Sequence, residues 1–588
     1  MPSHATALGR LPKVALINVP SMPMSTVREY CAGKPTFYYF AMPTGLIYVS
    51  SYAREHGAIS DSHLIDYRIG LSKLERVLSI EDFIREGARE VGFTPDIVAF
   101  TVNFTPSHEF LMMAATILKT EFWPNAAFVA GGHHVTSCVK QVLDNPCMDY
   151  VFRGEGEIGF TEFAKQLAAQ PEIKVKGVYS RKDVDSGATC MQACDIVDEL
   201  DELPHPDWHL LDMETYLTGG GKRGGTKARS YGDPKDAADR RVVTFSFSRG
   251  CPFQCTFCAS HLVHGRRMRY RDVEKTIEEL CMLRDRYGAN VFFPDDDLFT
   301  ASKPRTKALL KLFKEKLPGC ELQAPGGLSV NTLDREVLGL FVETGTTVIT
   351  LAVESGNEHV QREVIKKRCN LEKAQDHVAF LREKGVVVRV YFIIGFPDET
   401  LEQMQDTVDF AYNLKADWCA FSVAMPLPGS EMFDEFREMG VVNDNMDEWI
   451  DNFDSFRKFN TPLATAEQVR DIAYYANVRV NFLENANLRD GNYKRALALI
   501  DDIVIERPWH IVGQYCLKMC YERMGNHAEA ERLHQKIIDL ALTDHRAENM
   551  YRRTHHLLEH MDHSRLSHLQ RATPPDYKEA ALATVSTM

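Results

Sequence analysis

The chain has 588 residues, of which 44 % are hydrophobic and 26 % charged, and its formal net charge at pH 7 is −14. This length exceeds one hydrophobic core and predicts several domains, while the acidic total disfavours a nucleic-acid partner, because phosphate contacts need a basic face. No window reaches about 18 consecutive apolar residues and residues 1–10 lack a signal-peptide pattern, so we expect a cytoplasmic chain without a transmembrane segment.

The first segment, residues 1–200, alternates short apolar runs with amphipathic stretches. Helices are expected at 46–55 and 108–119, and strands at 14–19, 63–67, 96–102, 126–132 and 150–153. This alternation predicts an α/β fold with a doubly wound, Rossmann-like parallel sheet, whose ligands bind beyond the carboxyl ends of the strands. The residues of interest after those ends are Asn103, Gly131, Gly132, His133, His134 and Glu155. The glycines there would let backbone approach a bulky ligand, or would only form turns.

The alternation lapses over residues 201–240, which we interpret as a linker. Leu203-Pro204-His205-Pro206 favours an extended connection, and residues 219–225 form a glycine-rich basic loop. A domain boundary is therefore expected in this segment.

A second alternation covers residues 241–448. Strands are expected at 242–248, 291–294, 322–330, 348–354, 386–394 and 418–425, with a helical stretch after each of the first five. This rhythm predicts a partial (β/α)6 barrel of the TIM type, with an active site at the carboxyl ends of its strands.

The tail, residues 449–588, contains a short repeat. Residues 491–496 recur as 525–530, a spacing of 525 minus 491, or 34 residues, and Leu499 is matched by Leu533. That period is typical of tetratricopeptide-like helical hairpins, but two copies are fewer than the three or so that a free-standing array needs. We therefore expect the tail to pack on the barrel, either as a plain cap or with an added contact to a protein partner.

A cysteine motif follows the first expected barrel strand. Cys251, Cys255 and Cys258 have C-x3-C-x2-C spacing, which suits three irons of a [4Fe-4S] cluster and leaves the fourth iron without a protein ligand. That open iron can bind the amino and carboxylate groups of S-adenosylmethionine. The alternative is zinc, but a structural zinc site needs a fourth ligand, and none stands at finger-like spacing. Other paired cysteines are expected to be packing residues: Cys190, Cys194, Cys516 and Cys520.

Six motifs, in this order and spacing, give the span from about residue 12 to residue 435 its resemblance to a known family. They are residues 131–134, 151–157, the cysteine motif, and residues 353–356, 393–397 and 426–430. Together they resemble the cobalamin-binding radical S-adenosylmethionine family, called class B where its members are methylases. The resemblance implies a cobalamin-binding domain at 1–200 and a radical S-adenosylmethionine core at 241–448.

The resemblance also implies roles for single residues. Phe257 would pack on the adenine of S-adenosylmethionine, Glu354 would hydrogen-bond its polar groups, and Gly395 would let the nucleoside lie close to backbone. The corrin would lie over the sheet near Asn103, Gly131, Gly132, His133, His134 and Glu155.

Two features leave alternatives open. The D-x-H-x-x-G pattern of a lower axial histidine is absent, because Asp66 stands where the glycine would be, so the lower ligand of cobalamin is undetermined and a histidine of the His133-His134 pair could supply it or only hydrogen-bond in a turn. The acids at 295–297 could bind substrate or a cation, or form a solvated turn.

The resemblance implies an enzyme that transfers a methyl group to an unactivated carbon, or to phosphorus, of a small-molecule substrate through a 5′-deoxyadenosyl radical. An external electron donor such as flavodoxin or ferredoxin would then be a partner. One alternative is a non-methylating oxidation like that of the anaerobic magnesium-protoporphyrin monomethyl ester cyclase. Another is an iron-sulfur scaffold protein that recruits partners through the repeats, although the open iron argues against it.

Overall fold

A computed structural model describes residues 8–34, 42–170, 172–187, 191–219, 239–443, 458–561 and 563–570. The chain forms two compact units: the first contains the described parts of 1–228, 238–322 and 426–452, and the second those of 323–425 and 453–588. Cys190 and the glycine-rich loop beyond residue 219 lie outside the described residues. Across the described ranges, every helix is too short or too polar to cross a membrane.

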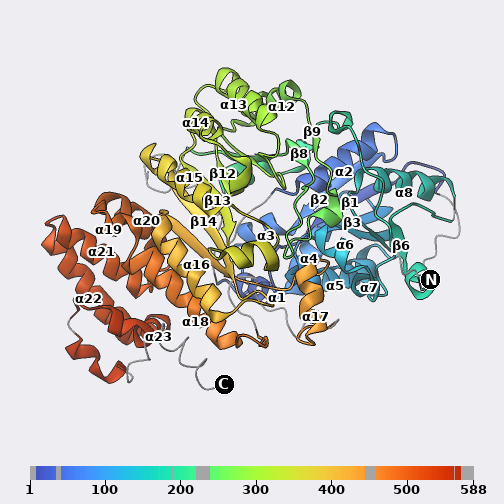
Figure 1. The fold of residues 1–588 in the computed structure, drawn as a ribbon. Helices are drawn as coiled ribbons and strands as arrows, with labels where there is room; N and C mark the ends of the chain where they lie inside the picture. The colour runs from blue at the N-terminus through green and yellow to red at the C-terminus, as the bar shows by residue number, and fades with distance from the viewer. Residues whose placement is uncertain are drawn as a thin grey trace. The chain divides into compact units, whose positions relative to one another are not determined.

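The N-terminal sheet of the first unit has the strand order β2-β1-β3-β4-β5-β6 (Figure 1). Its strands are β1 (Lys13–Asn18), β2 (Asp61–Asp66), β3 (Ile97–Thr101), β4 (Ala127–Gly131), β5 (Tyr150–Phe152) and β6 (Val178–Ser180). The first five are parallel and each overlaps a predicted strand. The sixth corrects the prediction of a wholly parallel sheet, because β6 pairs antiparallel with β5 at the edge.

Helices cover both faces of this sheet. The helices of its segment are α1 (Met24–Cys31), α2 (Thr44–Glu55), α3 (Tyr67–Lys73), α4 (Ile80–Arg89), α5 (His108–Ile117), α6 (His133–Ser137), α7 (Val139–Leu143), α8 (Glu157–Ala169), α9 (Arg181–Asp185) and α10 (Met213–Leu217). Ala99 and Val129 share a buried cluster with Phe163 of α8. Since side chains alternate along a strand, Phe100 and Phe128 point to the opposite face, where the Lys119 ammonium lies 4.9 Å from the Phe128 ring.

The six predicted barrel strands fall into two parallel sheets. The first unit holds β7 (Val242–Phe245), β10 (Val291–Pro294) and β11 (Glu321–Leu322), in the order β11-β10-β7. The second unit holds β12 (Ala324–Ser329), β13 (Val348–Glu354), β14 (Val387–Ile394) and β15 (Trp418–Val423), in that order. The predicted strand 322–330 is thus divided at Gln323. The intervening helices are α12 (Val273–Tyr287), α13 (Lys303–Lys316), α14 (Arg335–Glu343), α15 (Leu371–Glu383) and α16 (Leu401–Leu414).

The predicted strand 242–248 ends early. Asp296 accepts hydrogen bonds from the backbone N–H groups of Phe247 and Ser248, which turns the chain away from β7. Residues Ser248–Arg249 then form β8, which pairs antiparallel with β9 (Arg269–Tyr270). Two short helices complete this unit: α11 (His261–His264) and α17 (Glu431–Glu438).

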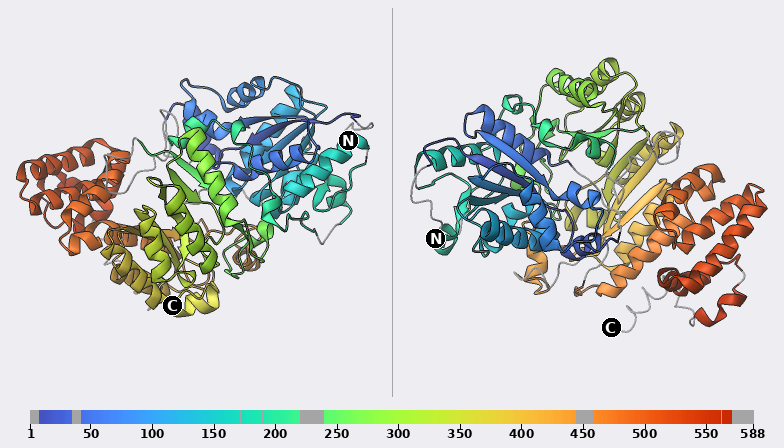
Figure 2. Two further views of the ribbon diagram at one scale, coloured as in Figure 1. Left: turned by 90° about the horizontal axis from the view of Figure 1, so that it is seen from above. Right: turned by 180° about the vertical axis from the view of Figure 1, so that it is seen from behind.

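The tail of the second unit is helical, and Figure 2 shows its helices gathered in one bundle. They are α18 (Ala466–Asn477), α19 (Ala486–Arg489), α20 (Tyr493–Glu506), α21 (Ile511–Arg523), α22 (His527–Thr543) and α23 (His545–Thr554), with the helical turn η8 (Val478–Leu483). Gly491 and Gly525, the repeated glycines, both have a positive φ. Each precedes an asparagine at the start of a helix, α20 and α22.

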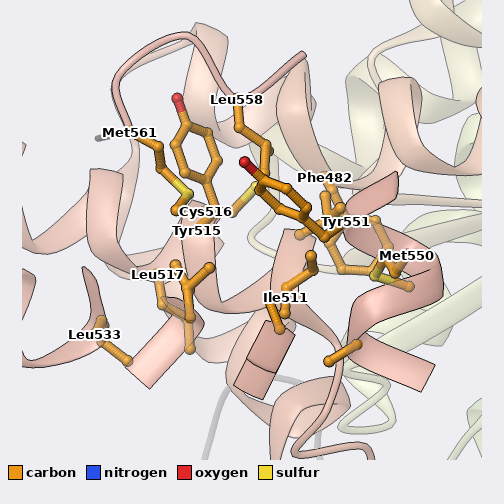
Figure 3. Close-up of a cluster of buried hydrophobic side chains, with 14 of the residues drawn as sticks. Phe482, Ile511, Tyr515, Cys516, Leu517, Leu533, Met550, Tyr551, Leu558 and Met561 are labelled. Carbon is orange, nitrogen blue, oxygen red and sulfur yellow. The ribbon is translucent and has the colours of Figure 1, made fainter. Parts of the chain in front are cut away.

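Apolar side chains from these helices form a common core (Figure 3). Its labelled members are Phe482, Ile511, Tyr515, Cys516, Leu517, Leu533, Met550, Tyr551, Leu558 and Met561. Cys516 and Cys520 are fully buried in it, and Cys194 is buried in the first unit, so these three cysteines are packing residues as predicted.

The tail is joined to the free edge of β15. The Asn481 side chain accepts a hydrogen bond from the Cys419 N–H at 2.7 Å and donates one to the Cys419 carbonyl. The buried Asp417 carboxylate binds Arg495 at 2.7 Å and accepts from the Val388 N–H at 2.8 Å. Because β15 ends the sheet, Asn481 satisfies backbone groups of Cys419 that a further strand would otherwise bind.

Candidate functional site

The cysteine loop begins directly after β8. Gly250 has φ 94°, and a Cβ at this position would lie 2.3 Å from the Arg267 carbonyl oxygen, so only glycine fits the turn into the loop. Within the loop the Cys258 N–H donates to the Cys255 carbonyl at 3.2 Å. The Met432 N–H donates to the Thr256 carbonyl at 2.9 Å, which ties the loop to α17.

The three thiols of the loop are each partly exposed, as is the Phe257 ring. Their chemistry fits a cluster, since three thiolates from one short loop suit a cubane with one open iron. In the described part of the chain, no three His, Cys, Asp or Glu side chains already stand together as a metal-binding group. The loop therefore fits the cluster through its donor set and spacing rather than through preformed geometry.

Glu155 lies at the centre of a buried ion-pair network. Its Oε2 lies 3.1 Å from Arg249 Nη1 and 3.0 Å from Arg269 Nη1, and its Oε1 pairs with Arg269 Nη2 and with His264 Nδ1 at 2.8 Å. Burial by itself would raise the pKa of Glu155, but Arg249, His264 and Arg269 more than offset it and hold that pKa well below its usual range. Arg249 also binds Glu157 at 2.7 Å.

This network gives the Glu155 side chain a role within the protein, and its contact with cobalamin stays a prediction. Both oxygens of its carboxylate are engaged by protein donors, and its side chain is 1 % exposed. Glu155 joins the loop after β5 to the segments on both sides of the cysteine loop, because Arg249 precedes the motif and His264 and Arg269 follow it. No sequence pattern pointed to these partners.

Asn103, Gly131, Gly132 and His133 meet at the carboxyl ends of β3 and β4. Gly132 has φ 107°, and a Cβ there would lie 2.6 Å from the Val102 carbonyl oxygen and 2.8 Å from the Asn103 side-chain oxygen. Glycine is therefore required at position 132, because residues 102 and 103 leave no room for a side chain. Asn103 is exposed, and His133 is partly exposed with its ring centroid 5.8 Å from that of His264.

His134, the second histidine of the pair, is turned inward. It is 2 % exposed, and its Nε2 lies 2.9 Å from Nδ1 of His108. Burial, assisted by His108, lowers the pKa of His134 to about 3, and burial together with His264 lowers the pKa of His133 to about 4. Both rings are thus neutral near pH 7, but the Nε2 atom of His134 is already engaged by protein.

The acids at 295–297 do not form a solvated turn. Asp296 binds the backbone of residues 247–248, and Asp297 accepts from the Gly250 N–H at 3.2 Å. Desolvation and the charge of Asp297 raise the pKa of Asp295 to about 6. Desolvation raises the pKa of Asp296 to about 7. Two of the three acids therefore shape the entry to the cysteine loop.

In the second unit, Glu354 and Gly395 end neighbouring strands. Glu354 closes β13 with φ 74°, and its Oε1 lies 2.7 Å from the Lys367 ammonium. Gly395 follows β14 with φ 82°, and its N–H donates to Glu399 Oε2 at 2.6 Å. Sequence reasoning missed both Lys367 and Glu399. The sequence did contain a signal for Glu399. It is an acidic residue between the end of β14 and Thr400, the N-cap of α16.

Comparisons with known proteins identify two domains in the chain. Residues 245–411 match the radical SAM superfamily, and residues 34–164 match the B12 binding domain. The chain is 28 % identical over 473 residues to the cytidylyl-2-hydroxyethylphosphonate methyltransferase of Streptomyces wedmorensis, covering 74 % of this chain and 83 % of the relative. It is 31 % identical over 394 residues to an uncharacterized methyltransferase of Pyrococcus horikoshii, covering 67 % of this chain and 78 % of the relative.

A solved structure shares the fold. The cobalamin-dependent S-adenosylmethionine radical enzyme OxsB, solved with aqua-cobalamin and S-adenosylmethionine bound, aligns with a TM-score of 0.58 at 14 % identity. The alignment covers 98 % of this chain and 84 % of that one. The helical tail therefore lies within the span of the shared fold.

Proposed function

The chain belongs to the cobalamin-binding radical S-adenosylmethionine family, and from that premise we propose that it transfers a methyl group to an unactivated carbon, or to phosphorus, of a small-molecule substrate. When bound, the [4Fe-4S] cluster supplies the electron that splits S-adenosylmethionine, and cobalamin supplies the methyl carrier. The work of this chain's own residues is to hold these groups and to keep them in place.

One observation carries the proposal: the cysteine loop and the carboxyl ends of the strands of the N-terminal sheet belong to one compact unit, joined by the ion pairs of Glu155. In it, Cys251, Cys255 and Cys258 hold the cluster and Phe257 packs on the adenine of S-adenosylmethionine. Residues 103 and 131–133 would hold the corrin. The match of residues 34–164 to the B12 binding domain supports this role.

In the second unit, we assign Glu354 and Gly395 to S-adenosylmethionine. A carboxylate accepts hydrogen bonds from hydroxyl or ammonium groups, and a glycine lets a nucleoside approach the backbone. Glu354 ends one parallel strand and Gly395 follows the next, at the carboxyl ends where ligands of such sheets bind.

The proposed organisation keeps four segments: a cobalamin-binding domain at 1–200, a linker at 201–240, a radical core at 241–448 and a helical domain at 449–588. The two family matches, at 34–164 and 245–411, support the first and third. For the tail we propose a tetratricopeptide-like hairpin, supported by the left-handed glycines 491 and 525 at the same spacing as the sequence repeat. We propose a cytoplasmic location and reduction by an external flavodoxin or ferredoxin.

Product analysis tests this function. The reconstituted, reduced protein with cobalamin is incubated anaerobically with S-adenosylmethionine carrying a trideuterated methyl group and with candidate substrates, phosphonates first because a relative acts on one. A product that gains the labelled methyl group supports the proposal. A product that loses hydrogen without gaining the label contradicts methyl transfer and favours the oxidative alternative.

A further inference from the structure

Left-handed backbone is concentrated around one short turn of the second unit. Among the described residues, four that are not glycine have a positive φ: Glu354, Lys366, Arg368 and Lys415. Lys415 ends α16 and Lys366 follows the helical turn Val360–Val364, and left-handed residues are common at helix ends. Glu354 and Arg368 end no helix, so their conformations need another explanation. Such strain persists only where the surrounding structure requires it.

In the turn at residues 366–368, the side chain of Lys367 is largely buried and those of its two neighbours are exposed. Lys366 and Arg368 are exposed, whereas the side chain of Lys367 is only 10 % exposed. The Lys367 ammonium lies 2.7 Å from Oε1 of Glu354, whose side chain is 8 % exposed. The two left-handed residues on either side of Lys367 therefore place a cation against the carboxylate that ends β13.

Gln361 connects the end of β13 to the turn that carries Lys367 through hydrogen bonds of its side chain. Its side-chain amide donates to the carbonyls of Val353 and Ser355, the residues on either side of Glu354, at 2.7 and 2.6 Å. Its side-chain oxygen accepts from the Cys369 N–H at 3.1 Å, just beyond the turn. One buried amide thus holds the end of β13 and the lysine turn in register with each other.

We propose that Lys367 is a positioning residue that orients the Glu354 carboxylate for S-adenosylmethionine, an inference that rests on the role assigned to Glu354 above. The ammonium binds one carboxylate oxygen, and a carboxylate has a second oxygen that can accept from a ligand. The cation also compensates a charge that would otherwise be buried alone. A charge-assisted contact fixes the direction of the carboxylate before the ligand arrives.

A purely structural ion pair explains these observations less well. A buried pair contributes little to stability compared with apolar side chains of similar size. Here the chain adopts unfavourable backbone at Glu354 itself and at Arg368 to keep the pair. Backbone strain of this kind clusters at ligand sites, where it fixes the direction of a side chain.

A double-substitution cycle tests the proposal. The dissociation constant of S-adenosylmethionine is measured anaerobically on the reconstituted protein for wild type, Lys367→Met, Glu354→Gln and the double variant. We expect each single substitution to weaken binding about tenfold, and the double variant to bind within about twofold of Glu354→Gln, because Lys367 acts through Glu354. Fully additive losses would overturn the proposal.

Further variants separate positioning from folding. Lys366→Met, the same change at the exposed neighbour, should bind like wild type. Lys367→Arg keeps a cation and should recover binding to within about threefold of wild type. The S-adenosylmethionine concentration that gives half of the change in the electron paramagnetic resonance spectrum of the reduced cluster should rise about tenfold in Lys367→Met and stay at the wild-type value in Lys366→Met.

The outcomes also distinguish a failure of the inference about Lys367 from a failure of the role proposed for Glu354. Wild-type binding by Glu354→Gln would remove the assigned role of Glu354 and overturn the inference with it. Weak binding by Glu354→Gln together with wild-type binding by Lys367→Met would overturn the inference alone.

Discussion

The Nδ1 atom of His264 lies 2.8 Å from Oε1 of Glu155. His264 ends the short helix after the cysteine loop, and Glu155 stands in the loop after β5 of the N-terminal sheet. Together with Arg249 and Arg269, this contact fastens the segments that flank the three cysteines to the sheet proposed to bind cobalamin. The relation predicts that the first unit loses its integrity when the Glu155 charge is removed.

Glu155→Gln should destabilise the protein by about 3–5 kcal/mol, because it leaves the buried Arg269 guanidinium without its counter-charge and Arg249 with only that of Glu157. Glu162→Gln on α8, an exposed acid paired with Lys165, should change stability by less than about 0.5 kcal/mol. Urea unfolding followed by circular dichroism compares the two variants. Equal midpoints for both would contradict the role given to Glu155.

Cobalamin should bind to the first unit without a protein histidine on its lower face. His134 is buried with Nε2 engaged by His108, and the ring of His133 packs against that of His264. The electron paramagnetic resonance spectrum of the cob(II)alamin form should therefore be the same in wild type, His133→Ala and His134→Ala. Nitrogen splitting that disappears in either variant would identify a histidine ligand and refute the prediction.

The tail should lose stability in acid through His510. Burial lowers the pKa of His510 to about 4, and its neutral Nδ1 accepts from the Gly513 N–H at 2.9 Å at the start of α21. Because the unfolded chain takes up this proton more readily, the contribution is complete above about pH 6.5 and is lost as pH falls toward 4, by ~1.4 kcal/mol per pH unit.

His510→Asn tests this dependence, since asparagine can still cap the helix but does not titrate. Between about pH 6.5 and 4.5 the wild type should lose more stability than the variant in urea unfolding. Exposed His527→Asn serves as the control and should keep the wild-type slope. Parallel curves for His510→Asn and wild type would rule out His510 as the titrating group.

The tail should also be required for the second unit to fold. Asn481→Leu leaves the N–H and carbonyl of Cys419 without their partner and should lower the free energy of unfolding by about 2–3 kcal/mol in urea unfolding. The control Gln535→Leu, at an exposed position, should change it little.

A chain ending near residue 449 loses all these contacts between the tail and β15 and should be poorly soluble. A soluble, active truncated protein would show that the tail is a detachable docking module.

Local patterns predicted most of the strands. The alternation of apolar and helical stretches located β10 and β13 with their observed bounds, because these strands are buried and bounded by clear helical segments. The antiparallel β6 was missed, since three partly buried residues carry no periodic signal. The early end of β7 depends on Asp296, about fifty residues away in sequence, and no local pattern encodes it.

The sequence predicted site residues only where the residues concerned are close together in the chain. Cysteine spacing identified the cluster loop within a few residues of chain. The partners of Glu155 lie 92 or more residues from the Glu155-Glu157 loop, so the sequence could not distinguish a ligand contact from an ion-pair hub. The inward turn of Lys367 arises from backbone angles at its two neighbours, which three consecutive basic residues, 366–368, do not reveal.

Formation of 5′-deoxyadenosine tests the central claim most directly. Wild type and Cys255→Ala are reconstituted anaerobically with iron, sulfide and cobalamin, reduced, and given S-adenosylmethionine, with Cys194→Ala as a buried cysteine outside the motif. We predict 5′-deoxyadenosine from wild type and Cys194→Ala and none from Cys255→Ala, because two thiolates do not retain a cubane with an open iron. Cleavage by Cys255→Ala at the wild-type rate, or no cleavage by the fully loaded wild type, would contradict the account.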